Sequence, residues 1–129
     1  MTRTHEKVSH SPESERTEHT AISAAQGIEQ AFKFVEGRWK LLILFHLFGG
    51  KVLRFSDLER AIPAISQKML AQQLRQLEAD GIVQRIVHSQ VPPKVEYRLT
   101  TWGQSLCPAL DALLKWAEMR NCDVPGADT

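Results

Sequence analysis

The chain has 129 residues, the usual size of one domain, and 43% of them are hydrophobic, which is enough for a buried core. The formal net charge is only +1, but residues 21–120 carry thirteen Lys and Arg against nine Asp and Glu, a balance compatible with a nucleic-acid partner. There is no apolar run of the ~18 residues that a membrane helix needs, and no signal-peptide pattern at the start. The two cysteines make neither a disulfide framework nor a zinc site, so we expect a cytoplasmic protein.

The two ends of the chain differ in composition from the middle. Residues 1–20 are rich in Ser, Thr, Glu and His and poor in large apolar groups, so we expect a disordered tail there, and a flexible tail over residues 121–129. His5, His10 and His19 are irregularly spaced, and we interpret them as solvated residues; a metal-binding tract is the alternative. The prediction is one folded domain over residues 21–120, without a metal or another cofactor.

Two helices are predicted before the first glycine pair. Residues 21–36 place Ile28 and Phe32 on one face, as an amphipathic helix does. Residues 38–48 are almost continuously apolar and end at Gly49, which suits a central buried helix better than a strand.

A pair of short helices joined by a tight turn follows. We predict the first helix over residues 57–61, with Ser56 as its N-cap and Glu59 completing a capping box. The second helix is predicted to begin after the N-cap Ser66 and to end at Gly81, because glycine readily takes the left-handed conformation that ends a helix. This order predicts a helix-turn-helix.

The outward face of the second helix suits DNA. Leu70, Leu74 and Leu77 form its inward stripe, and the acidic Glu78 and Asp80 fall in the last turn, away from the expected reading surface. Lys and Arg bind phosphate, Arg pairs with guanine and Gln pairs with adenine in the major groove; a solvated face is the alternative. The candidate DNA-binding residues of this helix are Ser66, Gln67, Lys68, Gln72, Arg75 and Gln76.

A β-hairpin is predicted next. Residues 82–88 are rich in β-branched side chains, residues 94–99 alternate apolar with charged, and the short segment 51–54 is placed to pair with them. A hairpin directly after a helix-turn-helix is a wing, although a hairpin that only covers the core is the alternative. The candidate DNA contacts on it are Arg85, Lys94 and Arg98, together with His88 and Gln90.

One long helix, Trp102 to about Arg120, is predicted to close the chain, capped by Thr100 or Thr101. Its apolar stripe exceeds what a small core needs, which indicates a protein–protein interface; packing within the chain alone is the alternative. The fold predicted overall is mainly α with a small β-hairpin (α+β), a winged helix-turn-helix with extra N- and C-terminal dimerisation helices. The candidate dimer-interface residues are Ile28, Phe32, Leu106, Leu110, Leu113, Leu114, Trp116 and Ala117.

Four blocks of the sequence, GRWKLLIL, RFSDLERAIPAISQKMLAQQLRQLEADGIVQR, VPPKVEYRLT and GQSL, resemble the HxlR family of bacterial winged helix-turn-helix transcriptional regulators. The resemblance spans about Ile28 to Trp116, with the order and spacing of all four blocks kept. It implies a homodimer, paired through its N- and C-terminal helices, that binds operator DNA and represses or activates nearby genes.

The chain departs from the family at one position. Members commonly carry a cysteine thirteen residues before the Trp of GRW, and several use it to sense oxidants or electrophiles. Here that residue is Gln26, which cannot form a thiolate. We expect Cys107 to be a buried, inert thiol, and a redox response through Cys122 is a hypothesis that Cys122→Ser would test.

The sequence therefore predicts a DNA-binding transcriptional regulator whose partners are double-stranded DNA and a second copy of itself. The alternative is a winged-helix protein–protein interaction module that does not read DNA. An enzyme is disfavoured because the chain has no phosphate-binding glycine loop, no metal-ligand spacing and no nucleophile with a recognisable base. The operator, the sign of regulation and any small-molecule effector stay open.

Overall fold

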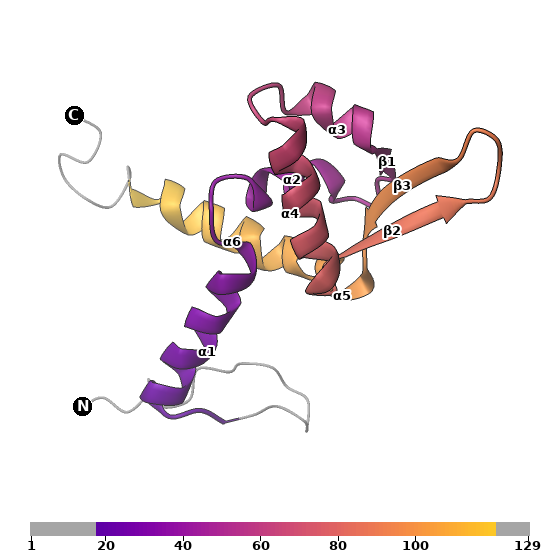
Figure 1. Cartoon of the computed structure of the whole chain (residues 1–129). Coiled ribbons are helices and arrows are strands. Elements are labelled where there is room, and N and C mark those ends of the chain that lie inside the picture. Colours follow the sequence, from indigo (N-terminus) through magenta and orange to yellow (C-terminus); the bar gives the residue numbers. More distant parts are fainter. Residues whose placement is uncertain (1–17, 121–129) are drawn as a thin grey trace. The chain divides into compact units, whose positions relative to one another are not determined.

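The computed structural model describes residues 18–120, which fall into two compact units with their boundary between Gly37 and Arg38 (Figure 1). The predictions for residues 1–17 and 121–129, including His5, His10 and Cys122, lie outside the described residues.

The first unit is built on one helix, α1 (Ala21–Val35), as predicted. Thr20 caps it reciprocally with Ser23: the Ser23 N–H donates to Thr20 Oγ1 at 3.1 Å, and the Thr20 N–H donates to Ser23 Oγ at 3.0 Å. Helix α1 carries Ile28 and Phe32, and both side chains are exposed.

The second unit is a winged helix-turn-helix, which confirms the predicted fold class (Figure 1). Its three strands form one antiparallel sheet in the order β1-β3-β2, so the short first strand pairs with the hairpin as predicted. The hairpin β2–β3 projects beyond the helices, and α6 extends from the opposite end of the unit. The elements are α2 (Lys40–Leu47), β1 (Leu53–Arg54), α3 (Phe55–Ala61), α4 (Gln67–Ala79), β2 (Val83–His88), β3 (Lys94–Leu99), α5 (Thr101–Gln104) and α6 (Leu106–Glu118).

The core of this unit lies where α2, α3 and α4 meet the base of the sheet. Each helix supplies side chains from one stripe, and the leucine stripe predicted for α4 is fully inside. Burying such a side chain stabilises the fold by roughly 1.5–3 kcal/mol. The most deeply buried residues are Ile43, Leu44, Leu47, Leu58, Ile62, Leu70, Leu74, Leu77 and Val83.

Helix α3 begins differently from the prediction. It starts at Phe55 rather than Asp57, so its N-cap residue is Arg54 and not Ser56. The third helical position then falls on Asp57 instead of Glu59, and the Arg54 N–H donates to Asp57 Oδ2 at 2.8 Å. The predicted capping box was wrong because its cap was placed two residues too late: the helix begins after Arg54, and the residue three positions after Arg54 is Asp57.

The predicted single long helix at the end of the second unit is two helices. Thr100 caps α5 by accepting the Gly103 N–H at 3.0 Å, and α6 begins after Ser105. Pro108 explains the break, because proline has no N–H to donate to Gln104 and its ring clashes with that carbonyl; proline is tolerated in the first turn of a new helix. The sequence contained this signal, but the leucine stripe outweighed it.

The end of α4, the root of the hairpin and the start of α5 share one joint. Gly81, with φ of 79°, turns the chain out of α4, and the Ile82 N–H donates to the Leu77 carbonyl at 2.9 Å. The Thr100 N–H donates to the Ile82 carbonyl at 3.0 Å, and Thr100 Oγ1 donates to the Gly81 carbonyl at 2.6 Å. A Cβ added to Gly103 would lie 2.2 Å from the Ile82 oxygen, so α5 packs directly on this backbone.

Candidate nucleic-acid interface

Helix α4 presents the polar face that the sequence predicted. Ser66 Oγ accepts the Met69 N–H at 3.1 Å, which confirms the predicted cap. Because the leucine stripe points into the core, the other side of the helix is left to solvent. Ser66, Gln67, Lys68, Gln72, Arg75 and Gln76 are all exposed.

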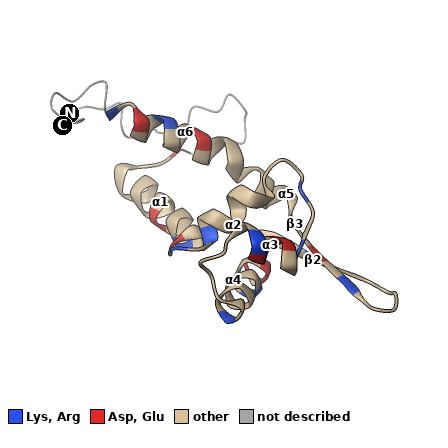
Figure 2. Cartoon of the chain, turned by 90° about the horizontal axis from the view of Figure 1, so that it is seen from above, with Lys and Arg blue, Asp and Glu red and all other residues tan. Residues whose placement is uncertain are grey.

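No acidic side chain interrupts this exposed face before the last turn of α4. Figure 2 shows the Lys and Arg positions along α4 and on the hairpin. Positive groups and amides therefore lie together on the helix that a helix-turn-helix places in the major groove. The assignment of individual residues to DNA stays a prediction.

The three cationic residues predicted on the wing do not share one surface. In the register of the hairpin, Arg85 pairs with Tyr97, whereas Gln84 pairs with Arg98 and His88 with Lys94. Since neighbouring residues of a strand point to opposite faces, Arg85 lies on the face that also carries the buried Val83 and Leu99. Lys94 and Arg98 lie on the opposite face.

Arg85 instead comes close to α4. Arg85 and Tyr97 of the hairpin line a cavity together with Ala71, Arg75 and Glu78 of α4. The sequence placed Glu78 outside the expected DNA-binding face of α4, but Glu78 lines the same cavity as Arg75. The signal was available in the helical period, which sets residues 71, 75 and 78 on one flank.

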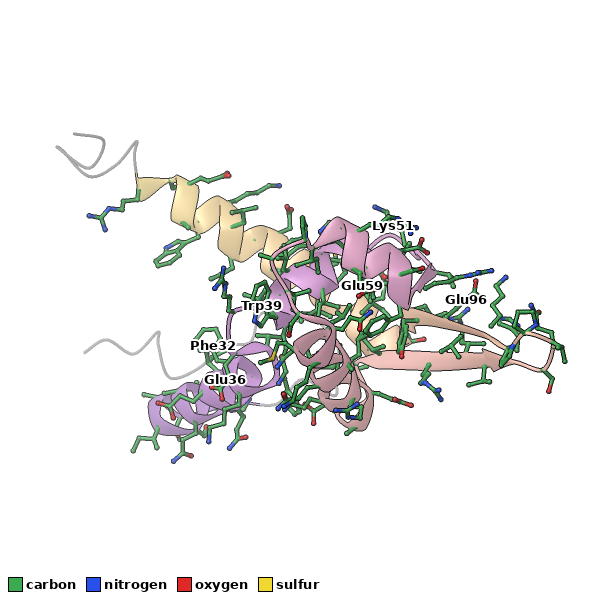
Figure 3. The ribbon with its side chains drawn as sticks, turned by 45° about the horizontal axis from the view of Figure 1, so that its top comes forward. Phe32, Glu36, Trp39, Lys51, Glu59 and Glu96 are labelled. Carbon is green, nitrogen blue, oxygen red and sulfur yellow. The ribbon has the colours of Figure 1, made fainter. Side chains whose placement is uncertain are left out.

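A polar cluster occupies the outer face of the hairpin around Glu96, which Figure 3 labels. His88 Nε2 lies 2.7 Å from Glu96 Oε1, and Lys94 Nζ lies 3.5 Å from Glu96 Oε2. An ionised carboxylate only accepts, so His88 Nε2 carries the hydrogen of this bond. The His88 hydrogen bond, and to a lesser degree the charge of Lys94, hold the pKa of Glu96 below its usual value of 4.5. Lys94 is thus engaged within the hairpin.

Replacing His88 with alanine is expected to raise the pKa of Glu96 towards 4.5, because the hydrogen bond that favours the carboxylate is lost. The stabilisation linked to this carboxylate exists at neutral pH and is lost as the pH falls through the lowered pKa. A carbon-detected NMR titration of the Glu96 carboxyl measures the change. Lys94→Ala is the comparison and should raise the pKa less; a larger rise than that of His88→Ala would contradict the order of causes.

The predicted interface residues leave large apolar side chains exposed in each of the two units. Trp116 is 70% exposed and Leu114 50% exposed, and no residue of α6 is buried. On α1, Ile28 is 56% and Phe32 53% exposed. Leu113 and Ala117 are also exposed, and Leu106 and Leu110 are half-buried.

Two further apolar residues are exposed in the second unit and were missed by the sequence analysis. Leu42 and Phe45, on the outer side of α2, are exposed although the opposite side of the same helix forms the core. The signal was a helix that is apolar on most of its circumference, which indicates that more than one of its sides becomes buried. Cys107, expected to be buried, is a free cysteine and only half-buried, because no residue of α6 lies fully in the core.

Within residues 18–120, no group of three or more His, Cys, Asp or Glu side chains is arranged to hold a metal ion. His19 Nδ1 instead lies 3.1 Å from Ser23 Oγ. None of the described helices is both long enough and apolar enough to cross a membrane.

The fold, with its capped and exposed polar helix followed by a wing, defines a winged helix-turn-helix DNA-binding protein. Residues 34–123 match the model of the HxlR-like helix-turn-helix family. The chain belongs to this family and is a transcriptional regulator, as the resemblance implied.

Relatives and solved structures agree with this assignment. The chain is 54% identical over 89 residues to YtcD of Bacillus subtilis, named as an uncharacterized HTH-type transcriptional regulator, and the match covers 69% of this chain and 70% of that one. The reduced form of the redox regulator HypR is similar in structure, with a TM-score of 0.68 at 44% identity over 76% of this chain and 95% of that chain. A transcriptional regulator of the MarR family from Enterococcus faecalis gives a TM-score of 0.72 at 35% identity, over 84% and 93%.

Proposed function

We propose that the protein acts as a homodimer that binds a pseudo-palindromic operator through two copies of α4. The observation that carries this proposal is the exposed face of α4, which presents Gln and Lys side chains and no acidic residue until the last turn. In a helix-turn-helix, the N-terminal part of this helix contacts base edges in the major groove. The hairpin then reaches the DNA backbone or the adjacent minor groove, where Arg85, Lys94 and Arg98 are the candidate contacts.

Exposed apolar side chains on α1 in the first unit, and on α2 and α6 in the second, support the dimer. Large exposed apolar groups of this kind commonly mark a protein–protein interface. Aromatic side chains are enriched at such interfaces, and Phe32, Phe45 and Trp116 are all exposed here. We expect a second copy of the chain to bury these apolar side chains, because symmetric homodimers are the commonest soluble oligomers.

Selection of bound sequences from a random DNA pool tests the proposal. We expect an enriched pseudo-palindrome with half-sites about one helical turn apart, and an affinity that falls steeply as salt is raised. A protein that only binds other proteins would enrich no sequence and show no salt-dependent DNA binding. The relatives are named as transcriptional regulators, which favours the regulator over an interaction-only module.

Replacing Gln72 with alanine is expected to weaken binding to the selected operator by about 1–3 kcal/mol, the usual loss for a good bidentate base contact. Binding to a scrambled duplex should hardly change, because an amide makes no charged contact with phosphate. Fluorescence anisotropy with both duplexes measures the difference. Gln30→Ala, which removes an exposed amide from α1, is the control. Equal losses on both duplexes would remove Gln72 from base reading.

We propose that the protein does not sense a signal through a thiol at residue 26, the position where members of the family commonly carry a cysteine. Gln26 lies exposed on α1, and an amide can neither ionise to a thiolate nor form a disulfide. HypR is named a redox regulator, but redox sensing by a thiol at residue 26 is not proposed for this chain, which has glutamine there.

A further inference from the structure

A cavity lies between α4 and the hairpin of the second unit. It has a volume of about 370 Å³ and is lined by Ala71, Arg75, Glu78, Arg85 and Tyr97. Arg85 and Tyr97 are directly paired across strands β2 and β3. The cavity therefore has one wall from the helix and one from the wing, with an arginine on each wall.

Neither guanidinium is neutralised within the described chain. Three acidic groups of residues 18–120 pair with a Lys or Arg: Asp57 with Arg60, Glu96 with Lys94, and Asp111 with Lys115. Arg75 and Arg85 form no ion pair there, although Glu78 borders the same cavity. Two free cations against one carboxylate leave a net positive site.

A guanidinium binds phosphate through a planar fork of N–H donors. Two such groups facing one cavity suit an anion that has several acceptor oxygens. Tyr97 lines the cavity on the hairpin side, and its phenol is a further hydrogen-bond donor of that residue.

We propose that this cavity binds a single phosphate group, held between Arg75 of α4 and Arg85 of the wing. The inference rests on the proposed function, because DNA is the source of phosphate to which we commit. When α4 lies in the major groove and the hairpin reaches the neighbouring minor groove, the strand that separates the two grooves crosses between helix and hairpin. One of its phosphates then enters the cavity.

The proposal gives distinct roles to three residues. Arg75 is a phosphate contact that positions α4 and reads no base, so base reading falls to side chains nearer the start of the helix. Arg85 holds the same phosphate from the other side and fixes the wing against the helix. Glu78 opposes both, because its carboxylate repels phosphate and keeps the affinity for every sequence lower than the two arginines alone would set it.

The test measures the salt dependence of DNA binding with the full chain, the selected operator and a scrambled duplex. Each neutralised phosphate contributes about 0.9 to the slope of log affinity against log salt. Arg75→Ala and Arg85→Ala should each weaken binding to both duplexes alike and reduce the slope by about one unit per half-site. The double variant should also lose only about one unit per half-site, because one arginine opposed by Glu78 leaves the cavity without net positive charge, so each single variant already loses the phosphate.

Two further variants complete the design. Lys115→Ala removes one positive charge from the polar side of α6 and should leave the slope unchanged. Glu78→Gln should tighten binding to both duplexes by about fivefold, as expected for removing one charge repulsion near the surface.

Several outcomes would overturn the phosphate clamp. A slope loss of about two units per half-site in the double variant would mean two separate phosphates. A loss confined to one operator position in Arg75→Ala would mean a base contact. Unchanged binding in both arginine variants, with tight binding of inorganic phosphate to the DNA-free protein, would assign the cavity to a free phosphorylated molecule instead.

Failure of the proposed function looks different from failure of the clamp. A wild-type protein that binds no duplex at any salt concentration would contradict the regulator itself. A wild-type protein that binds steeply, with slopes unaffected by either arginine, would contradict only the clamp.

Discussion

Replacing Gly103 with alanine is expected to lower the free energy of unfolding by about 2–3 kcal/mol, near the upper end of what overpacking usually costs. The added Cβ would lie 2.2 Å from the Ile82 oxygen and 3.1 Å from the Ile82 carbonyl carbon. The Ile82 backbone cannot simply move away, because its N–H is bonded to Leu77 and its carbonyl to Thr100. Thermal or urea unfolding at matched protein concentration measures the loss.

Gly27→Ala is the matched control for this variant. Gly27 lies inside α1 and has no atom within 4 Å of an added Cβ, so alanine there should leave the stability unchanged or raise it by up to about 1 kcal/mol. Equal unfolding curves for the Gly103 variant and the wild type would show that α5 does not pack on the α4–β2 joint as described.

Replacing Trp116 with alanine is expected to raise the dissociation constant of the proposed homodimer at least about 30-fold. Buried tryptophans at the centre of an interface commonly contribute 2 kcal/mol or more, which corresponds to that ratio. Trp116 is 70% exposed in the single chain and shares its side of α6 with Leu113. Sedimentation equilibrium over a range of protein concentrations measures the constant.

Lys115→Ala is again a suitable control, because Lys115 pairs with Asp111 on the polar side of the same helix. It should leave the dissociation constant unchanged within a factor of about five, as surface ion pairs contribute ~0–1 kcal/mol. A monomeric wild type, or a Trp116 variant that dimerises as well as the wild type, would contradict the proposed interface.

The parts of the fold with local signals could be predicted from the sequence. Helix α4 combines a leucine stripe, a serine cap and a terminal glycine, and each of the three points to the same element. The two strands of the hairpin were placed to within one residue, because β-branched residues and alternation marked them. The class of protein followed from the order of these elements.

The parts that depend on register or on competing local signals were less predictable. Two starts of α3 each place an acidic residue three positions after the cap: Arg54 with Asp57, and Ser56 with Glu59. The structure has the first of these. The break before α6 followed from Pro108 within an otherwise uninterrupted apolar stripe. Both errors concern a boundary, where one residue changes the outcome, and neither alters the fold.

The candidate site was predicted as a set of residues but not as an arrangement. Sequence placed Arg85, Lys94 and Arg98 on one wing, yet only the strand register shows that Arg85 faces α4 while the other two face away. The proximity of Glu78 to Arg85 spans a helix and a strand, and such contacts are set by packing rather than by spacing along the chain.

The joint formed by Gly81, Ile82, Thr100 and Gly103 has a consequence for the geometry of the operator. The joint links α4, the helix proposed to bind the major groove, to α5 and so to α6 through hydrogen bonds and backbone packing rather than through a long loop. In a homodimer closed through α6, the separation of the two reading helices is then a fixed length. The protein would then select operators by the spacing of their half-sites. An operator with another spacing would have to bend or twist to fit, at a cost in DNA deformation energy.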